Sequence, residues 1–234
     1  MDFRAYDIEF QIPWQSPFYL TKPADFLSHL IGHEGPGSLH SYLKNKGWIT
    51  YLSAGQSSQG RGRSRFGING MLTKEGFENR EAFVDAVFKY FALIRSSELA
   101  SYHYEEQRQM GEIHFRFAEK ANADDYAIMI AGNMNKPYAR EHVLSGRQRV
   151  WDWDESEVRG LLEEMVPEKA RVMFCTKDAK EFGERNRKRR KKKQEDEDGE
   201  WEKETWYGTE YRVRRLPEAL LKDVSRSLIW NIGN

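Results

Sequence analysis

The sequence predicts an α+β fold in which a largely antiparallel sheet packs against helices. Strand-like segments stand at both ends of the chain, and segments with the periodicity of amphipathic helices lie between them. The chain has 234 residues, of which 39% are hydrophobic and 13% aromatic, which is enough to bury a sizeable core. A globular domain of this class is therefore the starting expectation.

The N-terminal part is expected to form a strand, two short helices and a β-hairpin. Residues 3–12 are rich in aromatic and β-branched side chains, as strands are. Pro23 suits the first turn of a helix. Ser38 is the expected N-cap and Gly47 the expected C-terminal cap of the next helix. The two hairpin strands, on either side of a glycine-rich turn, are residues 48–56 and 63–72.

Helices dominate the middle of the chain. Thr73 is the expected N-cap of a long amphipathic helix whose apolar residues recur at the spacing of a core face. Residues 170–176 are expected to form a buried strand, with the Cys175 thiol in the core, and residues 205–213 another strand. The remaining helices are expected near residues 98–118, 124–132 and 154–165.

Composition limits the classes of function. Lys+Arg and Asp+Glu both number 37, so the net charge gives no reason to expect a nucleic-acid or membrane partner. A single cysteine, Cys175, excludes an internal disulfide and fits a reducing compartment. No apolar run is long enough to cross a bilayer. We therefore expect a soluble intracellular, cytoplasmic protein.

One charged segment, residues 178–204, interrupts the predicted elements. It contains seven consecutive basic residues, from Arg187 to Lys193, followed by a run of acids, and it has no apolar periodicity. A solvated insertion is expected, since such a segment buries little apolar surface. It is either a self-neutralising loop or a contact for a polyanion or nuclear-import factor. The sequence does not decide between these two.

Two sequence patterns suggest a metal site, but neither supplies a complete ligand set. His29 and His33 stand four apart, so on a helix they face the same way and could hold one zinc ion. Glu34 directly follows His33 and would point about 100° around the helix from it. The segment "HYEEQ" has Gln107 where the inverted zinc signature requires histidine. We expect no metal bound to this chain, and a zinc hydrolase using His29 and His33 is the least favoured alternative.

Four blocks carry a resemblance to a known family: "HLIGHEGPGSLHSYLKNKGW", "GINGMLTKEGF", "HFRFAEK" and "WYGTEYRV". Over roughly residues 4–217 the chain resembles the insulinase (pitrilysin-type) zinc metallopeptidases. The resemblance implies four homologous α+β domains around a closed chamber, with zinc bound by an H-x-x-E-H helix of the first domain. Residues 1–220 look like the second, non-catalytic domain, with the middle region starting after about residue 75 and a divergent tail at 221–234. The zinc ligands are then expected on a preceding segment, and this chain is expected to be inactive alone.

In this family the first block helps to form an exosite that holds the N-terminus of the substrate. The positions that match are His29, Gly32, Glu34, Leu52 and Gln56. The chemistry is suitable, because Glu34 can pair with an α-ammonium group and glycine at position 32 allows close backbone approach. The strand from Leu52 to Gln56 would offer an edge to an extended peptide.

Three neighbouring positions depart from the family pattern. Asp25 and Ser28 stand where close relatives carry histidine and glycine, and Ala54 replaces a glycine of the strand. The resemblance implies peptide substrates and the other domains of the same peptidase as partners. The alternative is a stand-alone peptide-binding or scaffold protein derived from such a peptidase, without catalytic activity.

Overall fold

A four-stranded antiparallel sheet forms the centre of the protein in a computed structural model, which describes residues 3–177 and 200–218. The basic run and the tail at 221–234 lie outside these residues. The strand order is β2-β3-β1-β4, so β2 and β4 are the edges. The strands are β1 (Arg4–Pro13), β2 (Ile49–Ser58), β3 (Arg63–Leu72) and β4 (Ala170–Thr176).

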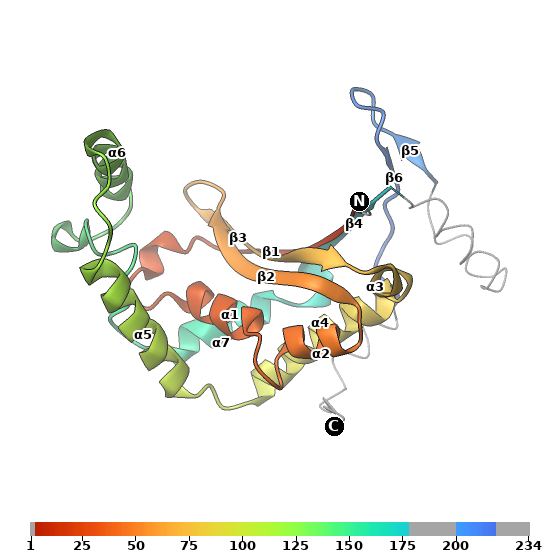
Figure 1. Ribbon diagram of the computed structural model, residues 1–234, viewed down its shortest axis with the longest axis horizontal. Helices are drawn as coiled ribbons and strands as arrows, with labels where there is room; N and C mark the ends of the chain where they lie inside the picture. Colours follow the sequence, from red (N-terminus) through yellow and green to blue (C-terminus); the bar gives the residue numbers. More distant parts are fainter. Residues whose placement is uncertain (1–2, 178–199, 219–234) are drawn as a thin grey trace.

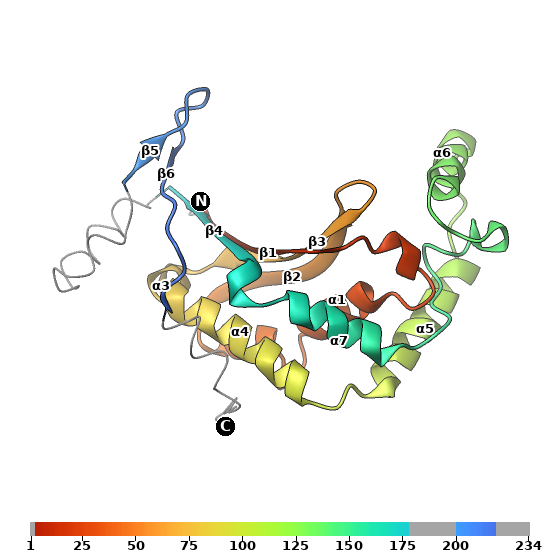
Figure 2. The ribbon, with the colours of Figure 1, turned by 180° about the vertical axis from the view of Figure 1, so that it is seen from behind.

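Helices cover one face of this sheet (Figures 1 and 2). Side chains alternate between the two faces of a strand, and on β1 Tyr6, Ile8 and Phe10 face the helices and are buried. Phe10 meets Phe88 and Phe91 edge to face, with ring centroids 6.1 and 5.7 Å away. The covering helices are α1 (Pro23–Gly32), α2 (Leu39–Asn45), α4 (Arg80–Ser96) and α7 (Glu155–Glu164).

The remaining elements lie at the two ends of the sheet, which leaves its second face open (Figure 1). Beyond one end, α5 and α6 form an arm, and a two-stranded hairpin of β5 and β6 rises beyond the other. None of the described helices is long and apolar enough to span a membrane. The bounds are α3 (Lys74–Glu78), α5 (Ser101–Arg116), α6 (Ala123–Met134), β5 (Glu202–Lys203), β6 (Glu210–Tyr211) and three short 3-10 helices at Ser16–Phe18, Arg140–His142 and Pro167–Lys169.

The predicted α+β class and most predicted elements are confirmed, and so are two caps. The Ser38 hydroxyl accepts a hydrogen bond from Ser41 N at 3.1 Å, and Gly47 has the positive φ of 69° expected after a helix. The helix after Thr73 differs from the prediction. Thr73 caps only the short α3, because the backbone leaves helical geometry at Asn79 (φ −101°, ψ 24°) before α4 begins.

The expectation of a core thiol at Cys175 was wrong, because the thiol is exposed. Strand β4 is an edge strand whose residues alternate between half-buried and exposed. Val172 and Phe174 pack against the core, while Met173 and Cys175 point to the open face. An apolar run alone does not distinguish a strand covered on both faces from one covered on a single face.

The expectation of one strand across residues 205–213 was also wrong. Residues 205–207 form a turn that Gly208 closes with a φ of 65°. The Glu204 carboxylate accepts hydrogen bonds from Trp206 N and Tyr207 N, each at 2.6 Å. Only Glu210–Tyr211 is a strand, and it pairs with Glu202–Lys203, at the end of the predicted charged insertion, in a sheet of its own.

Gly70 fixes the path of edge strand β2 and provides a stability test. A Cβ at position 70 would lie 2.0 Å from the carbonyl oxygen of Tyr51, next to an irregularity in the pairing of β2 with β3. Because Tyr51 O would have to move, we expect Gly70→Ala to lower the free energy of unfolding by about 2 kcal/mol or more. Gly55→Ala on β2 is the control, since nothing lies within 4 Å of its Cβ position. Urea denaturation of both variants tests this, and equal effects would contradict it.

Candidate functional site

Helix α1 lies against edge strand β2 and meets it near both ends. At its C-terminal end, a Cβ on Gly32 would be 4.0 Å from Ala54 N, which is an ordinary contact. At its N-terminal end, the Asp25 carboxylate shares a hydrogen bond with the Gln56 side chain. Within the described residues β2 pairs with β3 alone, so the main chain of β2 has an unpaired side.

The structure brings the five predicted exosite positions to α1, the loop after it and β2, but their side chains differ in orientation. Glu34 is exposed in the loop between α1 and α2, and Gln56 is exposed on β2. Leu52 is only 4% exposed because its side chain belongs to the core, so this position offers main chain alone. His29 is half-buried and turns toward α5. Gly32, the last residue of α1, lies beside β2.

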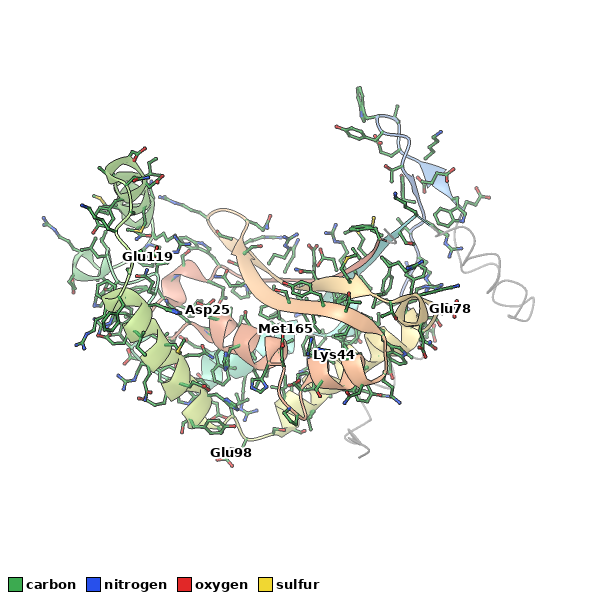
Figure 3. All side chains as sticks on the ribbon, in the orientation of Figure 1. Asp25, Lys44, Glu78, Glu98, Glu119 and Met165 are labelled. Atoms are coloured by element: carbon green, nitrogen blue, oxygen red, sulfur yellow. The ribbon has the colours of Figure 1, made fainter. Side chains whose placement is uncertain are left out.

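Asp25, a residue that departs from the family pattern, adds a carboxylate to this region (Figure 3). Reduced hydration raises its pKa, while Lys22, the hydrogen bond from Gln56 and Lys136 act in the opposite direction. Reduced hydration also lowers the pKa of Lys22 to about 8, and Asp25 opposes that change. Lys22 Nζ donates to the carbonyl of Arg147 at 2.6 Å. A polar cluster of both charge signs thus lies at the N-terminal end of α1.

A second cluster joins α1 to α5, which packs against it. His29 Nε2 lies 4.0 Å from a carboxylate oxygen of Glu106, and its ring centroid is 6.3 Å from that of His103. The side chains of His29, His103 and Glu106 each bring one potential ligand atom within 4.8 Å of the others. Reduced hydration, and secondarily His29, lowers the pKa of His103, although Glu106 opposes this. Sequence reasoning missed this group because its members come from two patterns considered separately.

The open face of the sheet carries a paired set of charges. Glu9, only 7% exposed, forms ion pairs with both Arg65 and Arg171. Asp7, two residues earlier on β1, lies beside Glu9, and its pKa is raised to about 6 by reduced hydration and then by the hydrogen bond and charge of Glu9. Next to this group is an open hollow of about 370 Å³, whose lining includes Asp7, Tyr51, Met71, Met173 and Cys175.

Because the pKa of Asp7 is raised, its contribution to the stability of the fold should depend on pH. The folded chain holds the Asp7 proton more tightly than the unfolded chain, whose pKa is near 3.8, so this contribution to stability is complete below pH 3.8. It is lost as the pH rises through about 6. We therefore expect Asp7→Asn to gain stability relative to the wild type between pH 4 and pH 7, by about 1 kcal/mol after allowance for solvent screening. Urea denaturation across this pH range measures it, and a difference that does not change with pH would contradict it.

Comparison with known families identifies the class of domain. Residues 2–110 match the family model described as the peptidase M16 inactive domain, and residues 115–231 match that of the middle or third domain of peptidase M16. The two matches meet near the end of α5, further along the chain than the start after about residue 75 that the resemblance implies for the middle region.

Individual relatives agree with these matches. The chain is 33% identical over 228 residues to a nardilysin-like protein of Arabidopsis thaliana, covering 96% of this chain and 20% of that protein. It is 32% identical over 205 residues to insulin-degrading enzyme of Homo sapiens, covering 88% of this chain and 18% of the enzyme. The crystal structure of pitrilysin superposes with a TM-score of 0.78 at 21% identity over 96% of this chain and 22% of that chain.

The fold and these matches define a non-catalytic α+β domain of a metallopeptidase type. The chain belongs to the peptidase M16 family, and it contains the inactive domain and a part matching the middle domain. It spans about a fifth of the length of the curated relatives it matches. The H-x-x-E-H pattern that would hold the family's catalytic zinc does not occur in this sequence, so these residues do not supply that ligand set.

Proposed function

We propose that this chain is the substrate-binding, non-catalytic part of an insulinase-type zinc metalloendopeptidase. In this proposal an extended peptide adds as a strand to the free side of β2, and its N-terminal amine lies near Glu34. The observation that carries it is the position of β2, an edge strand whose main chain at Ala54 lies beside a residue without a side chain, Gly32. Strand addition of this kind uses main-chain hydrogen bonds and is tolerant of sequence.

The contact at Gly32 supports the proposal because packing within the chain does not require glycine there. Its Cβ position is 4.0 Å from the nearest atom outside its own neighbourhood, and its φ is not in the left-handed region. Alanine would therefore fit the folded chain. The space above Gly32 is instead available to the main chain of a bound peptide, which approaches closely only where no side chain intervenes.

The charges nearby support an amine as the group bound. Glu34 is exposed, and within residues 3–177 and 200–218 no cation forms an ion pair with it. A free carboxylate of this kind can accept charge-assisted hydrogen bonds from an α-ammonium group. Asp25 is paired with Gln56 and lies near two lysines, so it is less available for this role.

The isolated chain is expected to bind peptides weakly, with a preference for a free N-terminus. Two to four main-chain hydrogen bonds, less the cost of ordering the peptide, give about 4 kcal/mol and a dissociation constant near 1 mM. N-acetylation should weaken binding in the wild type, and Glu34→Gln should remove the difference between the free and acetylated forms. Glu78→Gln, at an exposed position of α3, is the matched control and should keep this difference.

NMR titration of the labelled chain with one peptide in both forms makes this measurement. Equal affinity of the wild type for the free and acetylated peptide would exclude the role of the amine. Shifts that cluster away from residues 29–34 and 52–56 would exclude β2 as the binding edge.

Gly32→Ala separates peptide binding from folding. We expect the free energy of unfolding to stay the same or to rise by up to about 1 kcal/mol, because alanine suits a helix better than glycine. Peptide affinity should fall about 10-fold, which corresponds to about 1.4 kcal/mol, since the new methyl group occupies the space of the peptide main chain. The matched control is Gly160→Ala on α7, where nothing lies within 4 Å of the added Cβ. Unchanged affinity for Gly32→Ala would contradict the proposed docking position.

A further inference from the structure

Three side chains with metal-binding chemistry converge where α5 crosses α1. His29 comes from α1, and His103 and Glu106 stand three residues apart on α5, where side chains share one face. One ligand atom from each lies within 4.8 Å of the others, and His29 Nε2 is 4.0 Å from Glu106 Oε2. Potential nitrogen and oxygen ligands from two helices thus lie close together.

Each of the two histidines has a buried ring nitrogen without a hydrogen-bond partner. His29 Nε2 and His103 Nδ1 are both shielded from solvent, and neither forms a hydrogen bond with any group in the described part of the chain. Buried polar atoms are normally hydrogen-bonded, so an exception calls for an explanation. Two such nitrogens in a group that also holds the Glu106 carboxylate are explained if a cation binds among the three side chains.

We propose that one ring nitrogen each from His29 and His103, together with a Glu106 carboxylate oxygen, bind one divalent transition-metal ion of the zinc class. Two imidazoles and a carboxylate suit zinc, with water as the fourth ligand. Bond lengths of 2.0–2.2 Å place the ligand atoms of a tetrahedral zinc site about 3.3 Å apart. Glu106 is exposed and both histidines are partly exposed, so side-chain rotation can close the remaining gap.

His33 is not part of this site, although helix spacing makes it the obvious partner of His29. Its Nδ1 accepts a hydrogen bond from Gly35 N at 3.1 Å, which occupies that lone pair. Its ring centroid is 6.2 Å from that of His29, and its ring nitrogens are not among the converging ligand atoms. The structure therefore favours a site formed by His29, His103 and Glu106 over one formed by His29 and His33.

A bound ion would link α5 to α1, the helix that ends at Gly32 beside the proposed peptide site. α5 itself contributes only Tyr104 and Gly111 to the buried residues, so it has few apolar contacts that hold it. Ligands from positions 29 and 103 do not converge in an unfolded chain, and metal binding therefore stabilises the folded state. This inference does not depend on peptide binding.

Titration of the tag-free, chelator-treated chain with Co²⁺ and with Zn²⁺ tests the site, since a histidine tag would itself bind metal. We expect one ion per chain by calorimetry, visible absorption bands typical of four-coordinate Co²⁺, and a higher melting temperature with Zn²⁺. Metal binding should weaken more than about 100-fold in each of three variants: His29→Ala, His103→Ala and Glu106→Gln. This loss exceeds the effect expected from removing a residue that only hydrogen-bonds to a ligand.

His33→Ala and His114→Ala are the matched controls and should bind as the wild type does, with far-UV circular dichroism used to check that every variant folds. His114 lies on α5 in an exposed position. Binding that survives His103→Ala but is lost in His33→Ala would overturn the inference in favour of the pair on one helix. Absence of saturable one-site binding to the wild type would also overturn it.

Discussion

Both proposed sites depend on the packing of helix α1, which contacts edge strand β2 on one side and α5 on another. The sheet has one covered face, and α1 lies below its edge rather than below its centre. The helix can therefore present its last turn beside an unpaired main chain while its other side meets α5. Gly32 lies beside β2 and His29 lies near Glu106 of α5, although the two residues are only three positions apart. A shift of α1 along β2 would alter both.

Two carboxyl groups near the sheet have a raised pKa. Asp7 lies on the open face and Asp25 at the end of α1, and in both cases reduced hydration is the largest cause of a raised pKa. Asp7 also lies beside Glu9, which forms ion pairs with two arginines. Glu34 differs because it is exposed in a loop and has no ion-pair partner among the described residues, and our proposal therefore assigns it the external amine.

Local signals predicted the fold well where the structure depends on short-range geometry. Ser38 and Gly47 mark a helix as expected, because capping involves atoms within a few residues of each other. Predictions failed where an apolar pattern has more than one solution. Residues 205–213 have aromatic and β-branched side chains, but Gly208 and the Glu204 carboxylate make a turn there instead. Cys175 is exposed because β4 has neighbours on only one face.

By itself, the sequence determined the fold class, the strands of the hairpin and the family resemblance, because these rest on periodicity, capping and contiguous motifs. Only the tertiary structure decided that β2 is an edge strand and that the Leu52 side chain is buried. It also decided that His29 lies close to His103 and Glu106, and that His33 is not part of this group. Strand order and helix crossings are set by contacts between segments far apart in the chain. Spacing along one helix could suggest His33 as a partner, but it could not reveal a residue brought close by another helix.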